Sequence, residues 1–126
     1  MGELKRAYCL GEGLAGKTVL IVGAGRIGGE TARMVEALGA HAVLAGREDD
    51  LDRLLGEADI VSLHVPLTPE NRHLIDARRL ALMKPSAVLI NTARGPIVDE
   101  EALVAALQAG MISGAGLDVF EREPEV

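Results

Sequence analysis

The chain has 126 residues, enough for one domain with a single core, and a formal net charge of -6 at pH 7. With 2% aromatic residues and with its basic residues scattered along the sequence, it lacks the stacking platform and the basic stripe of nucleic-acid-binding proteins. No signal peptide, lipidation motif or long apolar span occurs, and a single cysteine, Cys9, excludes an internal disulfide. We therefore expect a cytoplasmic protein with no nucleic-acid, membrane or metal partner.

The first predicted strand leads directly into a glycine-rich turn. Residues 18–22 form an apolar, mostly β-branched run, which Gly23, Gly25 and Gly28 follow, and an amphipathic helix is predicted over 26–38. In such a turn the first glycine permits a tight bend, the second lets the backbone approach a pyrophosphate, and the third lets helix and strand pack closely. The N–H groups at the start of the helix bind the phosphates. This placement predicts a dinucleotide-binding site, and the alternative is an ordinary strand-to-helix turn.

The rest of the chain alternates strands and helices. Residues 1–17 are polar and Gly-rich, and we interpret them as an entry segment before an NAD(P)-binding domain over 18–126. Further strands are predicted over 42–45, 59–65, 87–92 and 114–119, and further helices over 50–58, 76–83 and 100–109. This alternation predicts an α/β fold, a Rossmann-type doubly wound parallel sheet of about five strands with the glycine turn at its centre. Ligands of such sheets bind outside the carboxyl ends of the strands.

Residues just after the strands therefore carry the candidate chemistry. Arg94 precedes a Gly-Pro turn, and its guanidinium could hold a carboxylate by two parallel hydrogen bonds, although an exposed arginine in a turn is the plainer interpretation. Asp118 falls on a buried strand, where an unpaired carboxylate is costly, so it requires a hydrogen-bond donor such as a carboxamide. His64, also on a strand, is interpreted as a half-buried histidine whose ring is satisfied.

The end of the second predicted strand bears on the choice of cofactor. Dinucleotide-binding domains carry an acid about 20 residues beyond the glycine motif, and this acid binds the ribose hydroxyls. Gly46 stands at that place here, and Arg47 follows it. Glycine leaves room for a 2′-phosphate and arginine offers charged donors to it, so the sequence favours NADP. NAD is the alternative, because Glu48, Asp49 or Asp50 could swing onto the ribose.

Five blocks of sequence carry a family resemblance. They are, in chain order, LAGKT (14–18), GAGRIG (23–28), SLHVPLTPE (62–70), NTARGPIVDE (91–100) and GLDVFEREP (116–124). With these blocks the chain resembles the nucleotide-binding domain of the D-isomer-specific 2-hydroxyacid dehydrogenases. That family reduces 2-keto acids to D-2-hydroxy acids, or runs the reverse reaction, with a nicotinamide cofactor. The resemblance therefore implies an oxidoreductase domain that binds NADP or NAD.

The resemblance also implies roles for individual residues. Arg94 is similar to the arginine that grips the substrate's carboxylate and keto oxygen, and Glu123 to the glutamate that pairs with a catalytic histidine and raises its pKa. The positions that match cofactor contacts are Arg26 and Ile27 at the pyrophosphate, Val65 with Pro66 near the ribose, Thr92 and Ala93 behind the nicotinamide, and Asp118 at the carboxamide.

The chain departs from the family pattern in several respects. The family's histidine follows the block that ends at Pro124, and none of the 3 histidines of this chain lies there. The family's separate substrate domain is also absent. The link over 46–50 is shorter than in the family, which usually carries another helix and strand there, so one edge strand is expected to be missing.

These departures leave several interpretations of function. The first is a truncated or reduced 2-hydroxyacid dehydrogenase domain with little activity alone, and the others are a non-catalytic NAD(P)-binding module and an engineered Rossmann scaffold. Family members commonly pair through this domain, and unpaired backbone groups at the shortened edge invite a partner, so a homodimer is expected. The expected substrate is a 2-keto or 2-hydroxy acid, whose identity depends on contacts in the missing domain.

Overall fold

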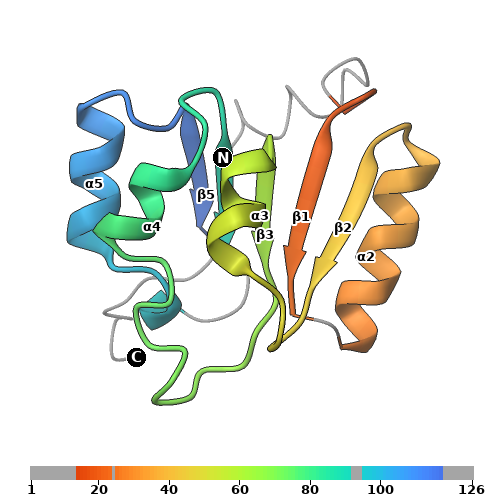
Figure 1. Cartoon of the computed structure of the whole chain (residues 1–126), viewed down its shortest axis with the longest axis horizontal. Helices are drawn as coiled ribbons and strands as arrows, with labels where there is room; N and C mark the ends of the chain where they lie inside the picture. The colour runs from red at the N-terminus through yellow and green to blue at the C-terminus, as the bar shows by residue number, and fades with distance from the viewer. Residues whose placement is uncertain (1–13, 24, 92–94, 118–126) are drawn as a thin grey trace, which may run out of the picture.

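The computed structural model describes residues 14–23, 25–91 and 95–117 of the chain. At its centre is a sheet of five parallel strands in the order β2-β1-β3-β4-β5 (Figure 1). The strands are β1 (Thr18–Val22), β2 (His41–Ala45), β3 (Ile60–Leu63), β4 (Val88–Asn91) and β5 (Gly114–Leu117). The helices are α2 (Arg26–Ala37), α3 (Leu51–Glu57), α4 (Ala77–Leu82) and α5 (Glu100–Gln108), with a short 3-10 helix, η1 (Gly95–Ile97), after β4.

The doubly wound parallel sheet predicted from the sequence is confirmed. Each predicted helix and strand is present, and within the described residues its ends differ from the predicted ones by at most two residues. The prediction that the glycine turn lies at the centre of the sheet is wrong, because β3 is the middle strand and β1 is second from the edge. The reason is that no strand of the described ranges pairs with the outer edge of β2, in agreement with the predicted shortening of one edge.

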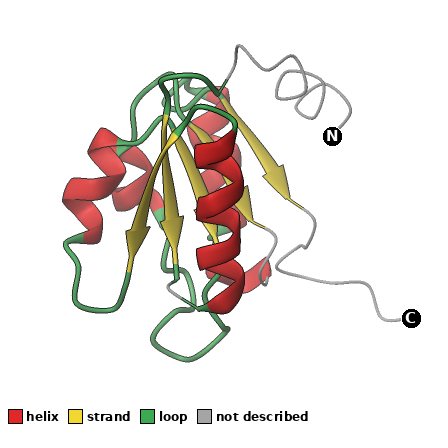
Figure 2. Cartoon of the chain, turned by 90° about the vertical axis from the view of Figure 1, so that its right-hand side faces the viewer, coloured by secondary structure: helices red, strands yellow, loops and turns green. Residues whose placement is uncertain are grey.

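Helices cover both faces of the sheet (Figure 2). On one face α3, α4 and α5 bury Leu55, Leu80 and Leu103 against the strands. On the other face α2 packs Ala32 against Ile21 of β1. Successive residues of a strand point to opposite faces, so β1 contributes to both cores. Burial of each large aliphatic side chain stabilises the fold by roughly 1.5–3 kcal/mol, and these two cores hold the strand ends in place.

Aspartate side chains start three of the four α-helices in the described ranges. Asp50, Asp76 and Asp99 each accept a hydrogen bond from the backbone N–H three residues further on, at 3.0 to 3.2 Å. Each such cap is worth about 1 kcal/mol. Within the described ranges, no helix is long and apolar enough to cross a membrane.

The connection between β2 and α3 is short. After Ala45 the chain turns through residues 46–50, and α3 begins at Leu51. The helix then leads to β3, on the far side of β1, and contacts both β1 and α4 on the way. Because α2 and α3 lie on opposite faces, the direction of winding switches between β1 and β3. Ligands of open α/β sheets bind at such a switch point, outside the carboxyl ends of the strands.

The glycine turn joins β1, α2 and β3 through backbone contacts. Gly23 has a φ of +112°, which favours glycine, and a Cβ on it would lie 2.9 Å from the carbonyl carbon of His64. A Cβ on Gly28 would overlap the carbonyl oxygen of Gly23. Both positions therefore require glycine for close approach, as the sequence motif predicts.

Adjacent glycines of α2 provide a matched pair of substitutions. Gly28→Ala is expected to lower the free energy of unfolding by about 1–3 kcal/mol, because the added methyl group overlaps backbone that cannot move freely. Gly29→Ala is the control, since a Cβ there meets no atom within 4 Å, and alanine in a helix interior should stabilise by about 0.5–1 kcal/mol. Urea unfolding of the two variants checks the prediction, and equal stability of both contradicts it.

Candidate functional site

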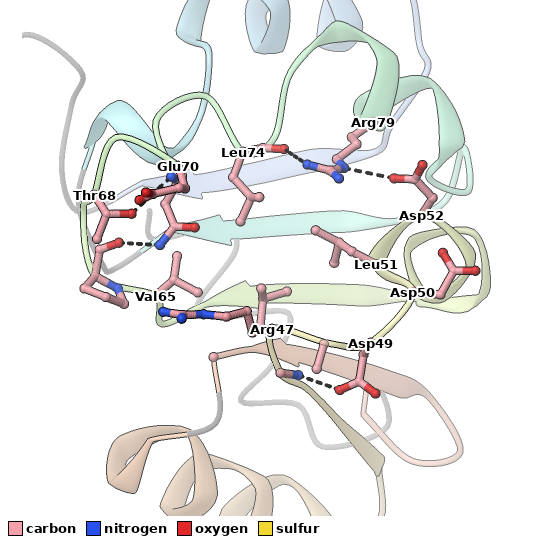
Figure 3. Close-up of a pocket in the computed structure, with 16 residues that line it drawn as sticks. Arg47, Asp49, Asp50, Leu51, Asp52, Val65, Thr68, Glu70, Leu74 and Arg79 are labelled. Atoms are coloured by element: carbon pink, nitrogen blue, oxygen red, sulfur yellow. Dashed lines mark hydrogen bonds and ion pairs between the residues drawn. The ribbon is translucent and has the colours of Figure 1, made fainter.

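A pocket opens at the carboxyl edge of the sheet, at the switch point between β1 and β3 (Figure 3). Its volume is about 730 Å³. The end of β1, the end of β2, the β2–α3 connection and the loop after β3 line it. The residues predicted as cofactor contacts that line this pocket are Gly23, Gly46, Arg47, Val65 and Pro66. The topology thus brings together residues from three separate segments of the sequence.

The start of α2 borders the glycine turn. Gly25 is the N-cap residue, no side chain caps this helix, and a Cβ on Gly25 would meet no atom within 4 Å. The first N–H groups of a helix have no partner within the helix, so this end can accept a pyrophosphate. Arg26 and Ile27 lie in the first turn and are exposed, and Arg26 forms an ion pair with Glu30 at 3.5 Å.

The end of β2 carries charge of both signs. The N–H of Gly46 donates to Oδ2 of Asp49 at 2.7 Å. Arg47 extends toward Val65, away from Asp49 (Figure 3). The pKa of the Glu70 carboxyl is lowered, chiefly by its own backbone N–H and by the Thr68 hydroxyl, with a smaller effect of the Arg47 charge. The carboxylates of Asp49 and Glu70 therefore give the pocket more negative charge than the pair Gly46-Arg47 alone indicates.

The loop after β3 is held in shape by Asn71. Its side-chain amide donates to the carbonyl of Pro66 at 2.8 Å, and its backbone N–H donates to the Thr68 hydroxyl at 3.2 Å. The sequence analysis did not identify Thr68 and Asn71 as site residues, although a threonine hydroxyl that bonds a backbone N–H further on is a known turn signal. These bonds fix the wall that faces Gly23 and Gly46.

An arginine cluster braces the far side of the pocket. Asp52 of α3 accepts from Nη1 of Arg78 at 2.7 Å and from Nε of Arg79 at 2.9 Å. Hydrogen bonds from Arg78 and then Arg79 lower the pKa of Asp52 to about 2. Arg79 also donates to the carbonyl of Leu74 at 2.9 Å. This cluster joins α3, α4 and the loop after β3, and the sequence analysis missed it because the partners are far apart in the chain.

His64 is a half-buried histidine with a partner, as predicted from the sequence. Its Nε2 lies 2.9 Å from the hydroxyl of Ser62, and burial lowers its pKa. The neutral ring is therefore favoured at neutral pH.

Several predicted site residues lie outside the described residues. They are Thr92, Ala93 and Arg94 after β4, and Asp118 and Glu123 after β5. Their roles at the nicotinamide and the substrate stay predictions.

Comparisons with known proteins support a dinucleotide-binding domain. Residues 2–126 match the family model described as "D-isomer specific 2-hydroxyacid dehydrogenase, NAD binding domain". Glyoxylate reductase of Thermococcus litoralis is 48% identical over 128 residues, which cover 91% of this chain and 39% of that protein. The chain thus spans well under half of this relative. The alignment has more positions than the number of residues of this chain that it includes. The relative therefore has residues within the aligned region that have no counterpart in this chain.

Solved structures show the same fold. A D-isomer specific 2-hydroxyacid dehydrogenase from Lactobacillus delbrueckii ssp. bulgaricus, in its NAD complexed form, is 43% identical with a TM-score of 0.79, over 83% of this chain and 35% of that one. An NADPH-dependent glyoxylate/hydroxypyruvate reductase from Sinorhizobium meliloti is 32% identical with a TM-score of 0.81, over 87% of this chain and 50% of that one. The chain therefore belongs to the family of NAD-binding domains of the D-isomer specific 2-hydroxyacid dehydrogenases.

Proposed function

We propose that this domain holds the nicotinamide dinucleotide of a D-2-hydroxyacid dehydrogenase that reduces a 2-keto acid by hydride transfer. The observation that carries the proposal is the pocket at the switch point, where the glycine turn faces the end of β2 and the loop after β3. The pyrophosphate is assigned to the uncapped start of α2, and the adenosine ribose to the pocket beside Gly46. The nicotinamide is assigned to the side of β4 and β5.

The chain's own residues divide the chemistry between them. The cofactor supplies the hydride, while Arg94 binds the substrate's carboxylate and keto oxygen through its planar fork of donors. Glu123 raises the pKa of a histidine that delivers a proton to the nascent alkoxide. A non-catalytic NAD(P)-binding module is the second candidate function, because the described pocket contains groups that suit a dinucleotide and none of the residues proposed for catalysis.

NADP is the proposed cofactor of the two. Gly46 leaves space beside the ribose, and Arg47 is an exposed cation in the same pocket. A guanidinium can form charged hydrogen bonds to a 2′-phosphate, which is absent from NAD.

The starting chain is expected to bind NADPH more tightly than NADH. Arg47→Ala should weaken NADPH binding several-fold and leave NADH unchanged, because only NADPH loses a charged contact of about 1–2 kcal/mol. Arg33→Ala, on the exposed side of α2, is the control with the same charge change. Gly46→Asp should shift the preference toward NADH. Titration by nicotinamide fluorescence measures the affinity of each of these four proteins for both cofactors, and equal affinities in the starting chain count against NADP.

Hydride transfer by the 126-residue chain alone is expected to be slow although the cofactor binds. Absence of a general acid costs about a hundredfold to ten-thousandfold in rate, and an open site loses positioning and water exclusion as well. The decrease in nicotinamide absorbance with glyoxylate, hydroxypyruvate or pyruvate measures the rate. Rapid turnover that Arg94→Ala abolishes contradicts this expectation, while binding without any turnover favours the second candidate function.

The outer edge of β2, which pairs with no strand among residues 14–23, 25–91 and 95–117, is proposed as a homodimer contact. The N–H of His41 and the C=O of Ala45 bond to the β1 side, at 2.8 and 2.9 Å. Alternate residues of a parallel strand face opposite neighbours, so the backbone groups of Ala42 and Leu44 face outward. A two-fold axis at Val43 places the β2 strands of two copies side by side and antiparallel. Ala42 of one copy then lies opposite Leu44 of the other, and their outward N–H and C=O groups form hydrogen bonds.

Sedimentation at high concentration is expected to show weak dimers. Leu44→Pro should give monomers, because it removes an outward N–H and leaves the bonds to β1 intact. Leu44→Lys is a second disrupting variant, since edge lysines oppose strand pairing, and Leu44→Val is the control that keeps the N–H. A starting chain that is only monomeric, or a Leu44→Pro dimer as stable as the original, removes the proposal.

A further inference from the structure

Asp49 delivers a carboxylate to the place that Gly46 leaves open. Its Oδ2 lies 2.7 Å from the N–H of Gly46 and 3.5 Å from the position that a Cβ on Gly46 would take. Gly46 stands at the end of β2, where dinucleotide-binding domains carry the acid that binds the ribose. A negative charge is thus present at that place although the residue there has no side chain.

The turn that holds Asp49 is closed from both sides. The N–H of Asp49 donates to the carbonyl of Gly46 at 3.2 Å, while the N–H of Gly46 donates to the carboxylate of Asp49. These bonds orient the carboxylate toward the pocket, which Asp49 lines together with Val65 and Pro66. Its second oxygen, Oδ1, is not used by Gly46 and can accept a bond from a ribose hydroxyl.

The neighbouring charged groups do not take over this role. Asp50 caps α3 through a bond from Arg53 N–H at 3.2 Å, and Asp52 binds two arginines. Arg47 points to the Val65 side, where its charge acts on Glu70 (Figure 3). Its charge is therefore directed away from the carboxylate of Asp49.

We propose that Asp49 is a specificity-determining residue, which opposes the 2′-phosphate of NADP and accepts a hydrogen bond from the 2′-hydroxyl of NAD. This role rests on the proposed function, because it concerns the same ribose subsite. Like charges at close range repel most strongly where water is partly excluded. Arg47 and Asp49 then act against each other, so the preference for NADP is smaller than Arg47 alone would give.

The test compares two substitutions that remove the same charge. Asp49→Asn removes the carboxylate but keeps an oxygen that can accept the bond from Gly46, whereas Glu48→Gln removes the charge of an acid outside the pocket lining. NADPH and NADH are titrated against each variant and the starting chain by nicotinamide fluorescence, at low and at high salt. Asp49→Ala is added as a variant that cannot form the bond to Gly46.

Asp49→Asn is expected to raise the ratio of NADPH to NADH affinity about three- to tenfold at low salt, and less at high salt, because salt screens the repulsion. Glu48→Gln should change the ratio less than about twofold, and Asp49→Ala should weaken NADH. The role of Asp49 is overturned if both cofactors bind and the ratio is unchanged, if Glu48→Gln shifts it equally, or if Asp49→Asn weakens both cofactors alike. Binding of neither cofactor to the starting chain overturns the proposed function and this role with it.

Discussion

The close contact between Gly28 and the carbonyl of Gly23 is the constraint on which the site depends. Because neither residue has a Cβ, α2 starts directly against the end of β1, and the turn lies over the backbone at His64. The three elements thus come into close backbone contact at this turn. A larger residue at either place would push α2 away from the sheet or the turn away from β3, and the crevice between them would change shape. The pocket is therefore a consequence of the packing of the two cores beneath it.

The short connection over 46–50 has two effects that follow from the same geometry. It brings the start of α3 to the mouth of the pocket, so that Asp49 and Asp52 approach the crevice from the side of β2. It also leaves the outer edge of β2 without a strand among the described residues. Arg79 then links α3 to the loop after β3, because it donates hydrogen bonds both to Asp52 and to the carbonyl of Leu74. One shortened segment therefore changes both the electrostatics of the site and the exposed edge of the sheet.

The sequence predicts those features that local chemistry determines. The strand and turn over 18–28 follow from β-branched residues and glycine spacing, and the cap at Asp99 follows from its place before an apolar helix. Contacts formed only by the three-dimensional arrangement were not predicted. The pairing of Asp52 with Arg79 joins two helices 27 residues apart, and the bond that closes the turn over 46–49 depends on which of three successive acids turns inward. The place of β1 within the sheet likewise depends on how many strands lie on each side of it, and the prediction that put the glycine turn at the centre did not take the missing edge strand into account.

Parallel strands place all their carboxyl ends at one edge, and this separates cofactor choice from chemistry. Neighbouring strands lie about 4.8 Å apart, so the end of β2 is roughly 14 Å from the end of β4. In the proposed arrangement, the pyrophosphate of the dinucleotide crosses the glycine turn after β1. The 2′ position of its adenosine ribose then lies near Gly46, and its nicotinamide ring lies on the opposite side of β3. In this arrangement, the charges of Arg47 and Asp49 act on the adenosine end and lie farther from the hydride donor than the screening distance in physiological salt. In the proposed arrangement, the residues around Gly46 therefore act on the choice of cofactor at a distance from the side of the sheet that is assigned to the nicotinamide.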